Sequence, residues 1–174
     1  MMKYIKLFEQ FVPKLNNEPI TVSSIGSFGQ RITNKGTNKI RKQDLIVATD
    51  NTIHQTVRDE IERLGKDADL NHIDVSQVTY MSSLFSHTDF QGDISQWDVS
   101  SVEDMNFMFN NCPNFNCDLS KWVVSNVEYM ALMFDGCKNF NQDISNWDVK
   151  KVEENINMFN NCPIKDEFKP KFNI

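Results

Sequence analysis

The amino-acid sequence predicts an α/β repeat solenoid of four short strand–helix coils, with an N-terminal capping helix and a small N-terminal α+β arm. Similar stretches recur 25 positions apart, as in "FNCDLSKWVV" (115–124) and "FNQDISNWDV" (140–149). Within each copy, the spacing of apolar residues changes from every second residue to a helical interval. A fixed period of this size is typical of solenoids, in which stacked copies share one core.

The register of the repeat is defined by Trp97, Trp122 and Trp147, which follow one another at a constant step of 25. An earlier copy at 71–85 keeps the same pattern at a step of 24. We therefore expect four stacked coils. The step of 25 also relates Asp93, Asp118 and Asp143; Val102, Val127 and Val152; Phe109, Phe134 and Phe159; and Cys112, Cys137 and Cys162.

Each coil is expected to contain a short strand followed by a short helix. In "QWDVS" (96–100), Trp97 and Val99 alternate with polar residues, as a half-buried strand requires. The apolar residues that follow have helical spacing, and Asn or Gly then ends the helix. In this copy the helical positions are Val102, Met105, Met108, Phe109 and Cys112.

Outside the coils, the sequence predicts further local elements. Residues 51–64 carry apolar side chains at helical spacing and are expected to form the capping helix. Residues 1–12 are expected to form a short helix with Ile5, Phe8 and Phe11 or Val12 as its apolar face, and 20–28 a strand or an extended arm. The expected organisation is a basic arm or small subdomain at 1–48, the capping helix at 49–70, the four-coil solenoid at 71–162 and a C-terminal cap or tail at 163–174.

The repeated pattern resembles that of a known family. "FQGDISQWDVSSVEDMNFMF" (90–109) and "FNQDISNWDVKKVEENINMF" (140–159) are similar to the BspA-like bacterial surface repeat, which also occurs in mycoplasma lipoproteins. The resemblance covers roughly residues 66–162. It implies a leucine-rich-repeat-like solenoid and a non-enzymatic adhesion or protein-interaction module, often displayed on cell surfaces.

Charge is distributed unevenly along the chain. Residues 1–48 hold eight Lys and Arg against three Asp and Glu, whereas the remaining 126 residues hold ten against twenty-one. The two parts therefore carry opposite net charges, which suggests two surfaces with different roles or one docked on the other. Glu9 and Gln10 interrupt the apolar character of the opening segment, so a cytoplasmic or virion-associated location is favoured over secretion. No apolar run is long enough to span a membrane.

Several residue types that recur at the 25-residue step could have a chemical role, but for each we favour a structural interpretation. The tryptophans suit the core, although a carbohydrate or peptide groove is the alternative. The column Asp93, Asp118 and Asp143 suits turn capping, with a bridging cation as the alternative. The recurring cysteines suit buried thiols rather than a metal ladder. No metal site, cofactor or catalytic set is expected, because His54, His72 and His87 are scattered, so the chain is not expected to be an enzyme.

Outward-facing side chains that differ between copies are the candidate binding residues. They are expected to recognise a protein or a surface glycan, with an ordinary solvated face as the alternative. A second possibility is a structural component of a larger assembly, such as a phage particle, anchored by residues 1–48. A third is nucleic-acid binding by 31–42, which is disfavoured because the rest of the chain is acidic. The candidate binding residues are His72, Asp74, Gln96, Asp98, Lys121, Val123, Asn146 and Asp148, and the basic arm is Arg31, Lys35, Lys39, Arg41 and Lys42.

Overall fold

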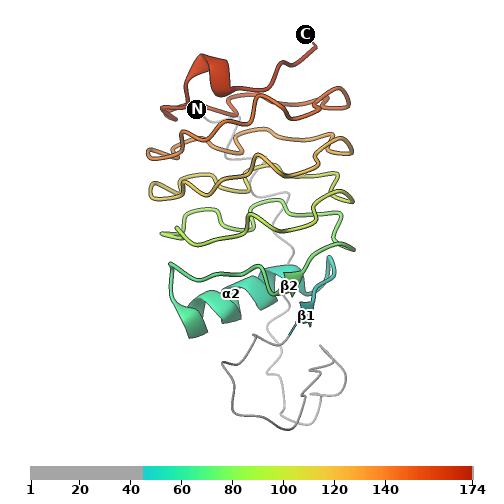
Figure 1. Ribbon diagram of the computed structural model, residues 1–174, viewed down its shortest axis with the longest axis vertical. Coiled ribbons are helices and arrows are strands. Elements are labelled where there is room, and N and C mark those ends of the chain that lie inside the picture. Colours follow the sequence, from blue (N-terminus) through green and yellow to red (C-terminus); the bar gives the residue numbers. More distant parts are fainter. Residues whose placement is uncertain (1–44, 174) are drawn as a thin grey trace, which may run out of the picture.

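A computed structural model describes residues 45–173 (Figure 1). Strand β1 (Ile46–Val47) and strand β2 (Ile73–Asp74) form a two-stranded parallel sheet in which Ile46 pairs with Ile73. Helix α2 (Ile53–Leu64) lies between them in sequence, and the 3-10 helix η2 (Asp166–Phe168) lies near the C-terminus. The helix, strand and basic segment predicted within 1–44 lie outside the described residues.

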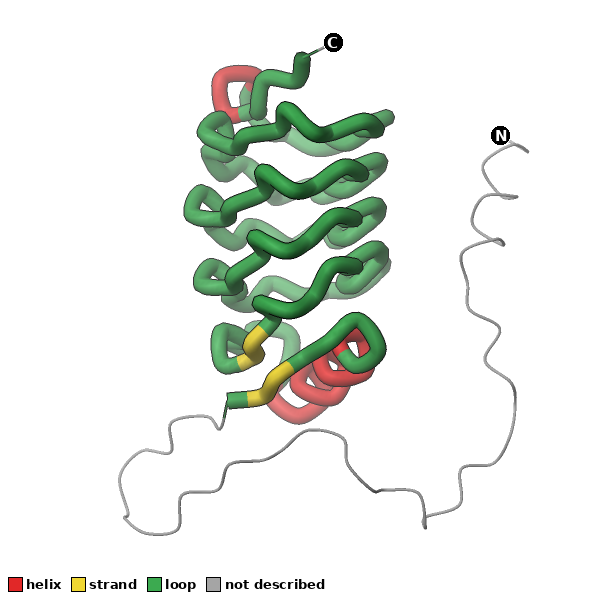
Figure 2. The backbone as a smooth tube through the Cα atoms, turned by 90° about the vertical axis from the view of Figure 1, so that its right-hand side faces the viewer, coloured by secondary structure: helices red, strands yellow, loops and turns green. Residues whose placement is uncertain are grey.

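The predicted leucine-rich-repeat-like α/β solenoid of four strand–helix coils is wrong. Across residues 45–173 the chain forms one α-helix and two short strands, and the remainder is almost entirely turns and loops (Figure 2). The helix expected over 51–64 is present as α2, but no helix occurs within residues 102–112 and no strand within 96–100.

Turns and loops are arranged in stacked tiers, which we define as successive 24- or 25-residue segments lying one above another (Figure 1). Isolated parallel bridges connect the tiers: Tyr80 pairs with Asp104, Asp104 with Tyr129, and Tyr129 with Glu154. Each bridge therefore joins residues that occupy the same position in neighbouring tiers. The tiers are held together by these contacts and by the buried side chains between them.

Residues 102–112 do not form a helix because their N–H groups bond elsewhere. An α-helix directs each N–H to the carbonyl four residues earlier. Here Phe107 N donates to Ala131 O on the next tier at 2.9 Å, whereas Met108 N donates to Met105 O, three residues earlier, at 3.2 Å. Phe107 has φ of 57°, a left-handed conformation that a right-handed helix cannot include. Along this segment, the backbone N–H groups therefore alternate between acceptors in the same tier and acceptors in the next tier.

Residues 96–99 show the predicted alternation of burial without a strand ladder. Trp97 and Val99 are buried while their neighbours are exposed. The Trp97 N–H closes a turn on Ile94 O at 3.1 Å rather than pairing with a neighbouring tier. Between tiers, side chains donate to backbone carbonyls instead: Trp122 Nε1 to Ile94 O at 3.2 Å, and Asn146 Nδ2 to Ser120 O at 2.7 Å. Side chains therefore supply bonds that a β-ladder would make with backbone groups.

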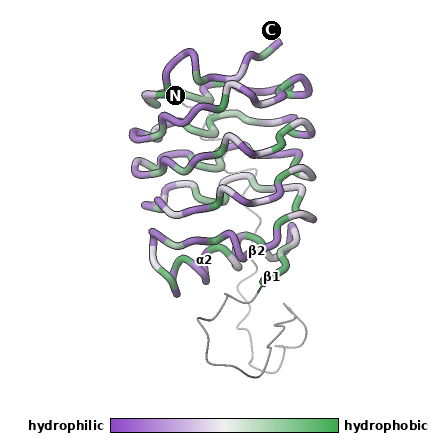
Figure 3. Tube along the Cα trace, in the orientation of Figure 1, coloured by the Kyte–Doolittle hydropathy of each residue, from purple (hydrophilic) through white to green (hydrophobic). Residues whose placement is uncertain are grey.

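The core is a column of aromatic rings that runs through the tiers. Phe109 is fully buried and stacks on Phe85 and on Phe134, with ring centroids 5.4 Å apart in both cases. It also stacks on Phe115 within its own tier at 4.0 Å. The three tryptophans are each only 4% exposed, so their predicted place in the core is confirmed. Figure 3 shows hydrophilic and hydrophobic residues interleaved along the tiers, as this arrangement requires.

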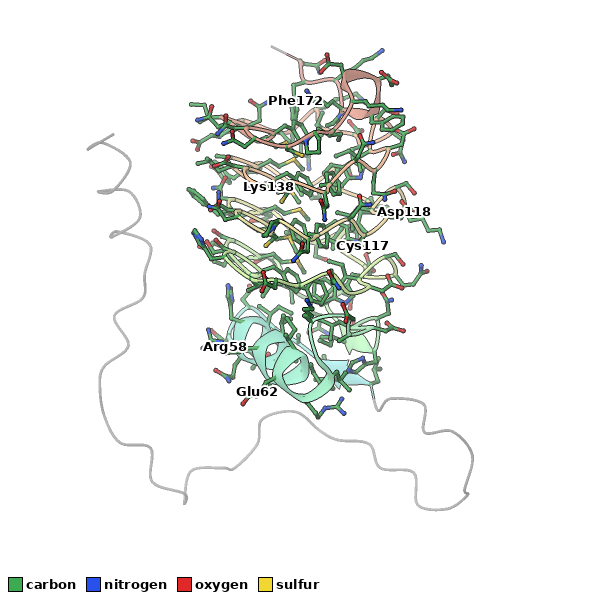
Figure 4. The ribbon with its side chains drawn as sticks, turned by 90° about the vertical axis from the view of Figure 1, so that its left-hand side faces the viewer. Arg58, Glu62, Cys117, Asp118, Lys138 and Phe172 are labelled. Atoms are coloured by element: carbon green, nitrogen blue, oxygen red, sulfur yellow. The ribbon has the colours of Figure 1, made fainter. Side chains whose placement is uncertain are left out.

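The two ends of the stack are covered differently. Helix α2 buries Ile53 and Val57 against the first tier, and its Arg58 and Glu62 lie on the outer side (Figure 4). At the other end, Phe168 O accepts a hydrogen bond from Ile144 N at 3.0 Å, and Ile164 is buried. Phe172 also packs against the core. Within residues 45–173, no helix has the length and apolar character needed to cross a membrane.

Candidate functional site

Six of the eight candidate binding residues lie in two exposed columns, which we call the outer columns. Each column has one member on each of three successive tiers, because the members alternate with the buried Trp and Val positions. Val123 is 56% exposed at a position where the tiers below and above carry an aspartate. The outer columns are Gln96, Lys121 and Asn146, and Asp98, Val123 and Asp148.

The other two candidates, in the first copy, are placed differently. The His72 side chain is only 6% exposed, and its Nε2 lies 2.9 Å from Glu60 Oε2 of α2. Arg63 donates to the same carboxylate, and this hydrogen bond holds the pKa of Glu60 below its ordinary value. Asp74 belongs to β2 and accepts from Ser76 N at 3.0 Å. His72 is therefore part of the helix–tier contact rather than of the exposed columns.

The aspartate column at 93, 118 and 143 caps turns, as the sequence indicated. Asp93 Oδ1 accepts from Ser95 N at 2.8 Å, and Asp118 and Asp143 make the same bond to the serine two residues later. Hydrogen bonds from the Ser120 N–H and hydroxyl hold the pKa of Asp118 below its ordinary value. These bonds stabilise the ionised carboxylates and explain why Asp recurs before Ser.

A shallow, open depression of about 350 Å³ adjoins this aspartate column. It is lined by polar side chains of two tiers, including Asp118, Gln142 and the outer-column residue Asn146. Figure 4 shows Asp118 and Cys117 at one side of the stack. Within the described part of the chain, no three Asp, Glu, His or Cys side chains converge to hold a metal ion.

Sequence reasoning missed two apolar side chains on another face. Phe107 and Leu132 have φ of 57° and 56° and are only partly buried, and neither packs against the hydrophobic core. The left-handed conformation costs an L-residue about 1–2 kcal/mol. Ser83 and Asn157 take the same conformation at the equivalent positions of the outer tiers. The signal was present in the sequence, because Phe107 and Leu132 fall outside the apolar helical pattern.

All four cysteines are free thiols. Cys112 and Cys137 are fully buried, as predicted, and donate to Phe85 O at 2.8 Å and Phe109 O at 2.9 Å. Cys162 and Cys117 are half-buried. Burial, followed by the negative charge of Asp93, raises the pKa of Cys117 to about 11.

The thiols are therefore expected to be poorly reactive in the folded protein, because only the thiolate is nucleophilic. Alkylation of Cys117 at pH 8 should be at least about 100-fold slower than that of a free cysteine with a pKa of about 8.5. Cys137, whose pKa burial also raises, should remain unlabelled. Mass spectrometry of peptides after timed iodoacetamide treatment measures both, with guanidinium-unfolded protein as the control. Rapid native labelling of Cys137 would contradict the expectation.

The basic residues Arg31, Lys35, Lys39, Arg41 and Lys42 precede the described part of the chain. Their role in nucleic-acid binding or assembly therefore stays a prediction.

Comparisons with known proteins place the chain in a family. No curated protein and no solved structure matches it. One family model, described as "Mycoplasma protein of unknown function, DUF285", matches residues 52–171, which is more than half of the chain and includes α2 and all of the tiers. The match agrees with the mycoplasma-type family that the sequence resembles. The chain accordingly belongs to the family described as Mycoplasma proteins of unknown function, DUF285.

Proposed function

We propose that this chain is a non-catalytic recognition module that binds a protein or a surface glycan through the outer columns. The observation that carries the proposal is the contrast between two sets of side chains on the same segments. Buried Trp and Val positions repeat almost unchanged, whereas the exposed positions between them differ from tier to tier. A scaffold that repeats its core and varies its surface is the usual arrangement of repeat-type binding proteins.

Val123 is the proposed anchor of this surface. Its side chain is more than half exposed and lies between Asp98 and Asp148 in its column, with Lys121 two residues away. An exposed apolar residue flanked by charged groups gives a partner a site to bury carbon atoms and to form ion pairs at the rim. The Asp148 carboxylate also lies 3.2 Å from Lys150 Nζ, so both signs of charge are present.

The reduced nucleophilicity expected of the thiols argues against a catalytic cysteine, which is compatible with the proposed binding role. Burial raises the pKa of Cys112, Cys137 and Cys162, and that of Cys117 is about 11. Reactive cysteines in enzymes have the opposite shift, because a neighbouring base or positive charge lowers their pKa.

The test places a photo-crosslinking amino acid at Val123 of the full chain. The matched control carries the same amino acid at Lys138, which is exposed and lies away from Asp118 in Figure 4. We expect a discrete protein or glycoprotein adduct from position 123 and none from position 138. Mass spectrometry identifies the adduct, and Val123→Asp in purified protein then measures the affinity. Asp is tolerated at this register in the neighbouring tiers, so the fold should be kept.

The expected loss of affinity for Val123→Asp is about tenfold, because burial of one valine side chain contributes on the order of 1.5 kcal/mol or more. An unchanged affinity, or equal labelling from positions 123 and 138, would contradict recognition by the outer columns. A partner whose binding instead depends on Arg31, Lys35 and Lys39 would favour assembly or nucleic-acid binding through the basic arm.

A further inference from the structure

A second surface, separate from the outer columns, lies in the segment after the turn that Val99–Val102 forms in one tier and that Val124–Val127 and Val149–Val152 form in the next two. We call it the ladder face, and it is defined by Phe107, Leu132 and Ile156. Phe107 N donates to Ala131 O, and Leu132 N donates to Ile156 O, each at 2.9 Å, so the three residues lie on three successive tiers. Ile156 is one position before Asn157, the equivalent of Phe107 and Leu132 in its tier. Ile156 is 52% exposed, and Phe107 and Leu132 are partly exposed.

The apolar character of the ladder face is not explained by the stack itself. Phe107 and Leu132 occupy a backbone conformation that favours Gly, Asn or Asp, and they do not fill the core. The equivalent positions below and above carry Ser83 and Asn157, which suit that conformation better. All four tiers take this conformation, so the stack sets the backbone, whereas two bulky apolar side chains at partly exposed positions offer a surface that another segment can cover.

Carboxylates precede the ladder-face residues in the chain, with Glu103 four residues before Phe107 and Glu128 four residues before Leu132. Glu103, Glu128 and Glu153 occupy one position on successive tiers, where each donates its N–H to the carbonyl of the tier below. The negative charges of Glu153 and then Glu128 raise the pKa of the neighbouring Tyr129 phenol, so both carboxylates lie close enough to this side chain to affect its ionisation. The ion pairs formed within residues 45–173 involve other carboxylates. The complementary occupant is therefore both apolar and basic.

We propose that the occupant of the ladder face is the N-terminal segment of the same chain, residues 1–14. In this segment Ile5, Phe8 and Val12 recur at helical spacing and would cover Phe107, Leu132 and Ile156. Lys3 and Lys6 lie outside that apolar stripe and would pair with Glu103, Glu128 or Glu153. Docking would thus bring together the basic and acidic parts of the chain.

The connection is long enough for this contact. Residues 15–44 separate the segment from the first tier and can extend to about 100 Å. The tiers that bear the ladder face are only about 5 Å apart, the usual spacing of hydrogen-bonded strands. Tethering also raises the local concentration of the segment to the order of millimolar, so modest affinity suffices.

The experiment is zero-length carbodiimide crosslinking of the full chain, which joins a lysine to a carboxylate only where the two are in contact. An equal mixture of isotope-labelled and unlabelled chains distinguishes links within one chain from links between two. We expect Lys3 or Lys6 to join Glu103, Glu128 or Glu153 within one chain. High salt should weaken the yield, because the ion pairs are exposed.

Two variants separate docking from folding. Phe107→Asn and Leu132→Asn suit the left-handed backbone, so the melting temperature should stay the same or rise while the crosslink yield falls at least about tenfold. Lys138→Gln, at an exposed position outside both the ladder face and the outer columns, should change neither. Mixed-isotope links would overturn the proposal in favour of a second copy. An unchanged yield in the Asn variants, or links mainly to Asp93, Asp118 and Asp143, would overturn it as well.

Discussion

Replacing Phe109 with alanine is expected to lower the free energy of unfolding by about 3–5 kcal/mol. The ring is fully buried and contacts aromatic rings on three sides: Phe85 below, Phe134 above and Phe115 beside it. Removing it leaves a cavity in the middle of the column, where neighbouring tiers are joined by hydrogen bonds and cannot collapse inward. Both the lost burial and the cavity reduce stability.

Urea unfolding of the purified chain measures the effect, with circular dichroism or tryptophan fluorescence as the signal. Phe159→Ala is the matched control, because Phe159 has the same register in the last tier but is only partly buried and stacks on Phe134 alone, at 5.8 Å. Its loss should be less than half as large. Equal losses for the two variants would contradict a shared core centred on the middle tiers.

Replacing Gly92 with alanine is expected to destabilise the fold by about 3 kcal/mol, the upper range for overpacking. A Cβ at this position would clash with the Ala68 backbone carbonyl and approach Phe90 Cε2 to 2.7 Å. The backbone cannot move away easily, because Asp93 N donates to the same Ala68 carbonyl at 3.0 Å and Asp69 bridges to Asp93. The added Cβ would therefore meet backbone atoms that hydrogen bonds hold in place, rather than a side chain that could rotate away.

Cys117→Ala and Gln142→Ala are the matched controls, since they occupy the same register in the next two tiers and already carry a Cβ. Their free energies of unfolding should change by less than about 1 kcal/mol, the usual range for positions that are not fully buried. Thermal or urea unfolding of the three variants under one set of conditions gives the comparison. A Gly92→Ala protein as stable as the other two would show that the loop near Ala68 adjusts at little cost.

The candidate site was predictable only where it depends on the alternation of buried and exposed side chains along one segment. Exposure of Lys121 and Val123 follows from their places beside buried Trp122, because successive side chains of an extended segment point to opposite sides. Burial of His72 could not be predicted in this way. The residue has the same register as Gln96, but Glu60 of α2 covers it, and the 25-residue pattern does not include α2.

The ladder face was missed because the backbone conformation of Phe107 and Leu132 depends on a neighbouring tier. Both residues lie in segments whose apolar spacing predicts a helix, and a helix would have distributed their side chains differently. The sequence shows that both residues fall outside the apolar helical pattern, but the bonds from Phe107 N to Ala131 O and from Leu132 N to Ile156 O are needed to place them on successive tiers.

By itself, the sequence determined which residues are buried together and where the turns begin. The step of 25 aligns the Trp, Phe and Cys columns, and each Asp-x-Ser closes a turn through bonds between residues two apart in the chain. Only the tertiary structure decided which secondary structure and which hydrogen bonds the backbone forms between those turns. The i, i+3 and i+4 spacing of Met105, Met108 and Phe109 suits both a helix and a string of turns, so it does not specify where the N–H groups donate. That choice depends on carbonyls 24 residues away, which become available only when the tiers stack.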